Sequence, residues 1–325
     1  VFDDQGDTEK ALNTYKKAKT ILVKLNSAQP EDENILLRLG QVSMNMGELL
    51  AITGEFDLSL IELKSAIEIS KQLIKGFPPE KVSIDKPSTH DRWWLHLRAI
   101  YMITDTYRRQ GDLDKGLSLL TEIMPIAKDA ADKLPSLLPN YADISYMKCN
   151  TLYQKSIDQN VVEACTEMAE QSKQALMQKP DEFRLNFNHS IDLAFLADMY
   201  RNLNQPEKAI GNINKALAIS EKLTQWDPDN QTTENDMISN MHTKGRILFE
   251  QGETATSDAI FNETYQRVLR ITEKNEALHF IHNKLYAEIY LNKLDDAQKT
   301  ADYLKSKGMK TRDLLELFGE LTRRQ

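Results

Sequence analysis

The sequence predicts an all-α fold of antiparallel helix hairpins stacked side by side, an α-α superhelix. Two marks recur along its 325 residues and predict this class. The first is a small residue five positions after a glycine, or in one copy after an asparagine, at the kind of turn that ends a helix. The second is a proline 19 positions after the small residue, where a helix interior cannot continue.

The small residues set the period of the repeat. They are Ala11, Ser59, Gly116, Ala209 and Ser257, with a degraded copy near Ala297, and counting back 19 positions from Pro180 places the corresponding position of one more copy at Val161. Successive intact copies lie 48, 57, 45, 48 and 48 residues apart. A larger side chain follows each of the five small residues four positions later on the same helix face, and Cys165 takes that place after Val161. Because one hairpin cannot bury both of its apolar faces, neighbouring copies are expected to stack.

The units follow one another along the chain. Their expected spans are about 1–30, 31–78, 91–135, 138–180, 183–228, 232–275 and 277–306. Residues 79–90, rich in proline, lysine and serine, are predicted to form an inserted loop that accounts for the step of 57. Gly308 is expected to end one helix and Thr311 to cap the next, a closing helix over 311–322. The whole chain, 1–325, is thus predicted to be a single solenoid.

The start of the chain looks cut. Phe2 takes the place of a residue in the middle of a first helix, so Val1 would begin inside that helix. Intact solenoids usually cap such ends. We therefore expect a fragment of a longer protein.

The composition limits the classes of partner that the chain is expected to bind. The formal net charge of −8 and a pI near 5.4 argue against nucleic acid, which needs a basic face. No apolar run reaches the 18 residues that would predict a membrane span. The sequence does not determine the cellular compartment. The cytoplasm is slightly favoured, and a periplasmic or extracellular location fits if the parent protein carries a membrane anchor.

The repeat resembles the tetratricopeptide repeat family. The match is clearest at Leu196, Ala197, Tyr200, Ala209, Ile213 and Ala216, with Pro228 later than in the family pattern. The family period is about 34 residues, and the extra length here is close to four helical turns, so two more turns in each helix keep the inward faces aligned. The long form is similar to repeats in bacterial multidomain signalling proteins such as serine/threonine protein kinases.

No pattern indicates catalysis or a cofactor. The chain lacks a phosphate-binding loop, G-x-G-x-x-G, H-E-x-x-H, C-x-x-C and G-x-S-x-G. His279 and His282 could share one helix face, but two ligands do not make a metal site. We therefore expect no enzyme, cofactor or metal here, and any catalytic domain would lie N-terminal to this chain. Cys149 and Cys165 are open to two interpretations: two buried thiols, or a disulfide formed in an oxidising compartment.

The family resemblance also implies a binding face. In the family, positions two, five, nine and twelve of the first helix of each unit line a concave groove. Carried onto this sequence, those positions are Arg98, Tyr101, Asp105, Arg108, Asp143, Tyr146, Asn150, Tyr153, Asp198, Arg201, His242 and Arg246. Tyrosine and arginine often dominate the energy of protein interfaces, although a solvated helix face could carry the same residues. The family's carboxylate clamp needs lysine and asparagine at set positions across neighbouring units, and that pattern is absent here.

The expected function is a non-catalytic scaffold that binds a peptide or protein in this groove. The resemblance places it as the sensory or docking region, C-terminal in a larger bacterial signalling protein, such as a kinase or a transcription regulator. The alternative is a self-associating architectural scaffold, joined through the cut first hairpin.

Overall fold

The structure, a computed structural model, describes residues 8–75, 87–156, 158–273 and 277–325. All regular elements in these ranges are helices, which confirms the predicted all-α class. None of these helices is long and apolar enough to cross a membrane. The chain divides into two compact units at residues 152 and 153, and each is described by itself.

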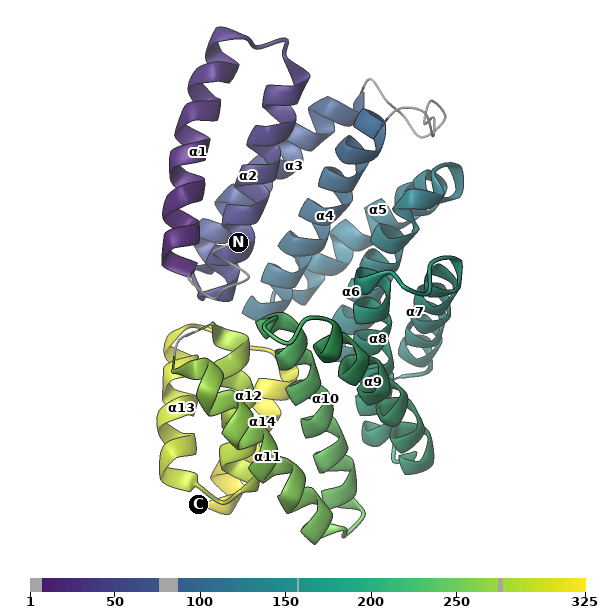
Figure 1. The fold of residues 1–325 in the computed structure, drawn as a ribbon, viewed down its shortest axis with the longest axis vertical. Helices are drawn as coiled ribbons and strands as arrows, with labels where there is room; N and C mark the ends of the chain where they lie inside the picture. Colours follow the sequence, from purple (N-terminus) through teal and green to yellow (C-terminus); the bar gives the residue numbers. More distant parts are fainter. Residues whose placement is uncertain (1–7, 76–86, 157, 274–276) are drawn as a thin grey trace. The chain divides into compact units, whose positions relative to one another are not determined.

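The unit of residues 8–152 begins with a lone helix and continues in hairpins (Figure 1). Its helices are α1 (Thr8–Ala28), α2 (Glu33–Ile52), α3 (Phe56–Lys75), α4 (Pro87–Gln110), α5 (Leu113–Lys133), the 3₁₀ turn η2 (Pro135–Leu137) and most of α6 (Leu138–Lys155). α2 packs against α3, and α4 against α5. The first helices of these two hairpins, α2 and α4, also touch each other, as stacking requires.

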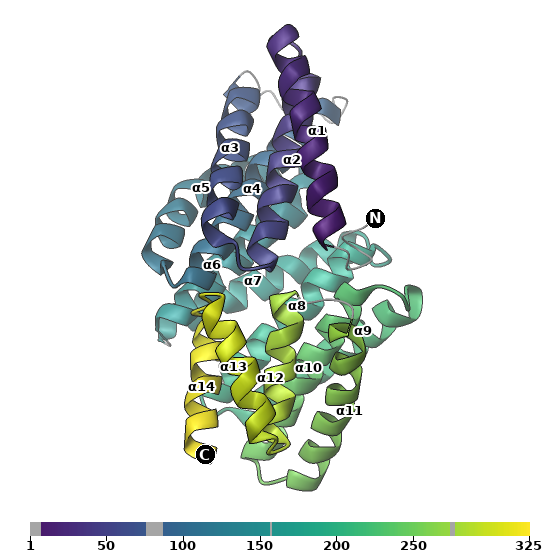
Figure 2. The ribbon, with the colours of Figure 1, turned by 90° about the vertical axis from the view of Figure 1, so that its left-hand side faces the viewer.

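The unit of residues 153–325 continues the pattern and ends with a single helix (Figure 2). Its helices are α7 (Gln159–Gln178), α8 (Phe183–Asn202), α9 (Pro206–Trp226), α10 (Gln231–Glu250), α11 (Thr254–Thr272), α12 (Leu278–Tyr290), α13 (Leu294–Ser306) and α14 (Arg312–Arg324). α8 pairs with α9, α10 with α11, and α12 with α13, while α10 touches both α8 and α12. α14 packs on α12 and α13.

The turns inside the hairpins have the predicted geometry. Gly54, Gly111 and Gly252 have φ values of 84°, 83° and 84°, in the left-handed region. Asn204, predicted to replace glycine there, has φ 55°. Asn292 adopts φ 58° in the last hairpin, five residues before Ala297. Asparagine tolerates this conformation better than other side chains, so the turn survives without glycine.

The small residues that set the period are all buried. Ser59, Ala209, Ser257 and Ala297 are fully covered. In two units the small residue is a serine whose hydroxyl donates to a backbone carbonyl 12 residues earlier. Ser59 Oγ lies 2.7 Å from the oxygen of Gly47, and Ser257 Oγ lies 2.9 Å from that of Gly245. A glycine at that point lets the helices approach closely.

Four of the five repeat prolines lie just beyond helix ends, as predicted. α1, α7 and α9 end at Ala28, Gln178 and Trp226, two residues before a proline in each case. The corresponding Pro78 lies outside the described residues, as do the expected cut helix around Val1 and most of the expected loop 79–90. α4 already begins at Pro87. Thr311 precedes α14, but its side chain makes no capping hydrogen bond.

Polar pairs join successive hairpins. Ser70 of α3 and Ser172 of α7 meet His96 and His189 of the following helix, with 2.9 Å from each Oγ to the histidine Nδ1. Both hydroxyls donate to carbonyls of their own helix, so each histidine Nδ1–H is the donor to the serine. Burial, with Lys71 nearby, lowers the pKa of His96 to about 4. The histidine at this contact between successive hairpins is therefore neutral.

The third such pair uses an aspartate. One oxygen of Asp236 in α10, Oδ2, accepts three hydrogen bonds. They come from Ser220 at 2.6 Å, from Ser190 at 3.0 Å and, over a longer distance, from Asn240. Burial raises the pKa of Asp236 to about 6, although these hydrogen bonds oppose the shift. Cys149 and Cys165 are each buried and disulfide-bonded, so neither is a free thiol.

Candidate functional site

The predicted residues of α4 and α6 form a polar face in unit 8–152. Arg98 of α4 lies at its centre. Its Nη2 is 3.4 Å from Glu48 Oε1 of α2, and its Nη1 is 3.7 Å from Asp143 Oδ2 of α6. The guanidinium also lies 4.8 Å from the ring centre of Tyr101. Three successive first helices, α2, α4 and α6, thus present side chains to one arginine.

Two turns further along α4 than Arg98, a carboxylate is held by two arginines. Asp105 Oδ1 accepts from Arg108 at 2.7 and 2.9 Å, and its Oδ2 accepts from Arg109 at 2.7 Å. Burial alone would raise the pKa of Asp105, but the two guanidiniums outweigh burial and hold the pKa well below its usual range. The group is therefore a fixed negative charge and a poor proton acceptor.

The α6 side of this face is formed by Tyr146 and Asn150. Asn150 Nδ2 donates to the Tyr146 hydroxyl at 3.0 Å, one helical turn away. Asn150 is buried, whereas Tyr101 and Tyr146 are partly exposed. Burial raises the pKa of Tyr101 well above its ordinary value, so it presents a neutral hydroxyl. Face N denotes from here the seven residues Arg98, Tyr101, Asp105, Arg108, Asp143, Tyr146 and Asn150.

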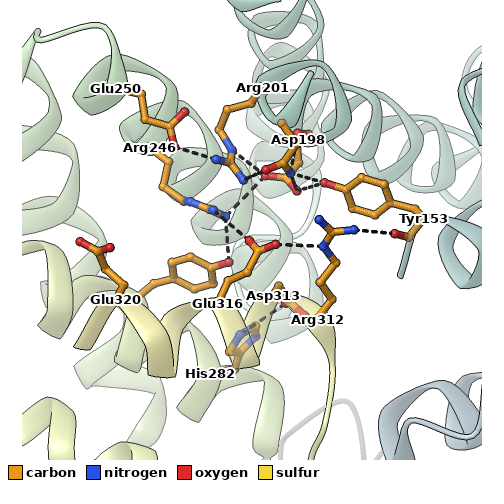
Figure 3. A network of polar contacts seen from close by, with 12 residues as sticks. Tyr153, Asp198, Arg201, Arg246, Glu250, His282, Arg312, Asp313, Glu316 and Glu320 are labelled. Carbon is orange, nitrogen blue, oxygen red and sulfur yellow. Dashed lines mark hydrogen bonds and ion pairs between the residues drawn. The ribbon is translucent and has the colours of Figure 1, made fainter. Parts of the chain in front are cut away.

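The remaining predicted residues lie in unit 153–325, where Asp198 of α8 is the hub (Figure 3). Asp198 Oδ2 accepts from the Tyr153 hydroxyl at 2.9 Å, and its Oδ1 accepts from Arg201 Nε, also at 2.9 Å. Arg201 reaches on to Glu250 of α10, at 2.6 Å. Burial is the largest influence on Asp198, yet Arg201 and Arg246 reverse it and lower its pKa.

Arg246 of α10 extends this network. Its Nη1 donates to the Tyr286 hydroxyl at 3.0 Å and lies 3.5 Å from Asp198 Oδ1. Arg246 is only 8% exposed, and its Nε has no hydrogen-bond partner among the described residues. A buried guanidinium nitrogen without an acceptor is costly, so the site has one unused donor. Face C denotes from here the residues Tyr153, Asp198, Arg201 and Arg246.

His242 lies apart from both faces. It is 2% exposed, with its ring stacked 5.7 Å from Phe261 and 5.4 Å from Tyr286. Its Nε2 lies 2.9 Å from the Thr264 hydroxyl. Burial lowers the pKa of His242 to about 3, so the ring is neutral. It joins α10 to α11 and α12 in the interior and supports Tyr286 from beneath.

Helix α14 covers face C, a contact that the sequence did not predict. Glu316 Oε2 lies 3.6 Å from Arg246 Nη2, and Glu316 Oε1 accepts from Arg312 at 2.9 Å. Arg312 in turn donates to the backbone carbonyl of Tyr153 at 3.1 Å (Figure 3). At the first turn of α14, Asp313 lies 3.4 Å from His282 of α12.

The other end of α14 is fixed by an aromatic contact. Arg324 lies 5.3 Å from the ring centre of Phe249 and 5.1 Å from that of Tyr290, and it donates to the carbonyl of Ile289 at 3.2 Å. Leu314, Leu317 and Leu321 are buried on one stripe of the helix. α14 is therefore held by an apolar stripe in the middle and arginines at both ends.

One pocket lies on another side of the same unit. It has a volume of about 360 Å³, with an apolar floor and a charged rim supplied by α9, α10 and α11. Its floor includes Leu217, Met237 and Met241. None of the twelve predicted residues lines it. Among the described residues, no group of three or more side chains is arranged to hold a metal ion.

The comparisons with known proteins agree with the fold. No protein-family model and no curated protein matches the chain. Among solved structures, a Rap protein complexed with competence and sporulation factor aligns with a TM-score of 0.58, at 13% identity, over 97% of this chain and 79% of that one. A tetratricopeptide repeat protein from Parabacteroides merdae aligns with a TM-score of 0.43, at 12% identity, over 97% and 98%. The chain has a tetratricopeptide-type fold.

Proposed function

We propose that the chain is a non-catalytic scaffold that binds a segment of another polypeptide along the first helices of its hairpins. The observation that carries the proposal is the position of Arg98, shared by α2, α4 and α6 on face N. Its two ion pairs, at 3.4 and 3.7 Å, are long for charge-assisted hydrogen bonds. A partner carboxylate could therefore gain a closer contact with this guanidinium than Glu48 or Asp143 makes.

The chemistry of face N suits polypeptide recognition. Tyr101 and Tyr146 offer partly exposed rings with neutral hydroxyls, and such side chains lose little entropy when they are covered. Asp105 and Arg108 add fixed charges of both signs. The partner segment is expected to combine an acidic side chain, for Arg98, with an apolar one against the tyrosines. The similar Rap structure, which holds a bound factor, supports the capacity of this fold to carry a ligand.

A displayed library of random peptides, panned against the purified chain, tests this function. We expect binders whose affinity falls about tenfold or more in a Tyr101→Ala, Tyr146→Ala variant, the effect of losing two interface anchors. Ala substitution of Lys128 and Asp132, an exposed ion pair on α5, is the matched control and should leave the affinity unchanged. Absence of binders, or binders indifferent to the tyrosines, would contradict the proposal.

The biological setting is part of the same proposal. The long repeat supports a docking or sensory region of a bacterial signalling protein, with any kinase or regulatory domain elsewhere in the parent. The parent coding sequence upstream of Val1 tests this directly: a kinase or DNA-binding domain is expected there, and a membrane enzyme of another class would contradict it.

Self-association is the second candidate, favoured by α1. This helix exposes Ile21 and Leu25, 59% and 42% exposed and one turn apart. Apolar side chains gathered on one helix face are typical of an interface. Light scattering over a range of concentrations tests it: a mass that doubles with concentration, and returns to one chain on Ile21→Asp substitution, supports self-association, and a constant mass of one chain excludes it.

A further inference from the structure

Helix α14 has the contacts of a bound ligand. It packs on α12 and α13, and side chains at both of its ends also reach α6, α10 and α12. Arg312 and Glu316 belong to the last helix, yet their partners Tyr153 and Arg246 lie on face C. Face C lies on α6, α8 and α10, which are first helices of hairpins, and the proposed function places a segment of another polypeptide along such helices.

The fit between α14 and face C is incomplete. Arg246 offers Nε and Nη2 side by side, a geometry that a carboxylate matches with two parallel hydrogen bonds. Glu316 comes only within 3.6 Å of Nη2, and Nε has no partner among the described residues. The side chain of Glu316 is 37% exposed, and it is shared with Arg312. A better-placed carboxylate would satisfy the nitrogen that Glu316 leaves without an acceptor.

The apolar contact defines the rest of the pattern. Leu314, Leu317 and Leu321 are 0%, 3% and 2% exposed, and their spacing of three and four residues is that of one helix face. An extended peptide cannot present three leucines at this spacing along one line. The chemistry of the site therefore selects an amphipathic helix with a carboxylate between its first two leucines.

We propose that α14 is an exchangeable internal occupant of face C, and that the external partner is an amphipathic helix that carries a carboxylate in the place of Glu316. This inference rests on the proposed function and concerns a different stretch of the chain from face N. While α14 is docked, only a small fraction of molecules offers the site, so the apparent affinity for the partner is reduced by that fraction. A change that loosens α14 therefore raises the apparent affinity of the chain for the partner helix.

The test uses the full chain and a labelled synthetic peptide of residues 309–325 as the probe. Binding is followed by fluorescence anisotropy with the wild-type chain and with an Arg312→Ala, Glu316→Ala chain, in which α14 is loosened. We expect weak binding to the wild type and binding about tenfold tighter or more to the double variant. An Arg323→Ala, Lys299→Ala chain, which loses one exposed ion pair within α14 and one within α13, is the control and should behave as wild type.

Substitutions in the peptide, measured against the same chain, give a comparison that does not depend on how well the double-variant chain folds. A peptide with Glu316→Gln should bind the double variant about tenfold more weakly than the parent peptide. A peptide with Arg323→Ala should bind as the parent does. In the wild-type chain, a saturating concentration of peptide should also accelerate hydrogen exchange in α14 and leave α8 and α9 unchanged.

Three outcomes would overturn the inference. They are equal binding to the wild-type and loosened chains, insensitivity of the peptide to Glu316→Gln, and no binding to either chain. A loosened chain that instead forms dimers by exchange of α14 would identify a second copy as the occupant and reject an external partner. Because these measurements avoid Tyr101 and Tyr146, their failure is separate from failure of the library experiment on face N.

Discussion

The guanidinium of Arg312 in α14 donates a hydrogen bond to the backbone carbonyl of Tyr153, 159 residues earlier in the chain. The same guanidinium lies 5.3 Å from the centre of the Tyr153 ring. Tyr153 in turn directs its hydroxyl to Asp198. The last helix is therefore connected to the polar hub of its unit through one residue, in a fold whose other contacts are mostly between neighbours in sequence.

Arg312→Ala should loosen α14 without unfolding the unit. The change removes the bond to Tyr153, the ring contact and the pair with Glu316, and because Arg312 is partly exposed we expect a loss of about 1 kcal/mol. Hydrogen exchange measured peptide by peptide should rise in α14 alone. Arg323→Ala on the same helix is the control, since its pair with Glu320 is 72% exposed on the arginine side. Equal effects of the two substitutions would deny a special role to Arg312.

Acid should weaken unit 8–152 through His96. Burial first, then Lys71, lowers its folded-state pKa from 6.5 to about 4. A base with a lowered pKa contributes stability above its unfolded pKa, and that contribution is lost as the pH falls from about 6.5 toward 4. We expect a loss of about 2 kcal/mol between pH 7.5 and 5 in urea unfolding. A His96→Gln chain should show a flatter dependence, and an identical slope would contradict the assignment.

Asp236 should give the unit of residues 153–325 the opposite pH dependence of stability from the one that His96 gives unit 8–152. Burial raises its folded-state pKa to about 6, so the folded unit favours the protonated acid. An acid with a raised pKa makes its full contribution below the unfolded pKa, near 4, and loses it as the pH rises through about 6.

Asp236→Asn is therefore expected to stabilise the unit at pH 7.5. The amide oxygen can accept the three hydrogen bonds now made to Oδ2, without a buried charge. A gain of about 1–2 kcal/mol is expected at pH 7.5, and little or none at pH 4. Urea unfolding of both chains at the two pH values measures this difference. A variant that is less stable at pH 7.5 would show that the carboxylate is needed.

Two glycines in unit 153–325 should respond to alanine with opposite signs. A Cβ on Gly245 would lie 2.9 Å from the ring of Phe261, which is fully buried and has no room to move. We expect Gly245→Ala to cost about 2 kcal/mol through overpacking. A Cβ on Gly211 meets nothing within 4 Å, so Gly211→Ala in α9 should gain about 0.5–1 kcal/mol from helix propensity. Thermal unfolding of the two variants compares them directly.

The local part of this fold could be predicted from the sequence. Ser59, Ala209 and Ser257 are buried as their 48-residue spacing indicates, and Asn204 adopts the left-handed turn assigned to it. Both signals depend on residues close to one another in the chain. The closing helix, expected over 311–322, is α14 at Arg312–Arg324.

The contacts between distant segments could not be predicted in this way. Nothing near Glu316 indicates that it meets Arg246, because a pair separated by 70 positions leaves no period in the sequence. The burial of His242 between Phe261 and Tyr286 likewise depends on three helices at once. The polar contacts between successive hairpins did have a sequence pattern. Ser70, Ser172 and Ser220 each lie 11 residues after one of the positions that set the repeat. Their partners are His96, His189 and Asp236, three buried titratable groups whose pKa values are shifted by burial.

The bond from Arg312 to Tyr153 also bears on synthesis. Hairpins of this kind can form in turn as a ribosome releases them, because each needs only its neighbours. Face C differs, since Tyr153 and Arg246 have to wait for α14, the last helix described here, to leave the exit tunnel. During that interval a nascent chain would display this arginine-rich face open, and an encounter with a partner helix would then meet no competitor.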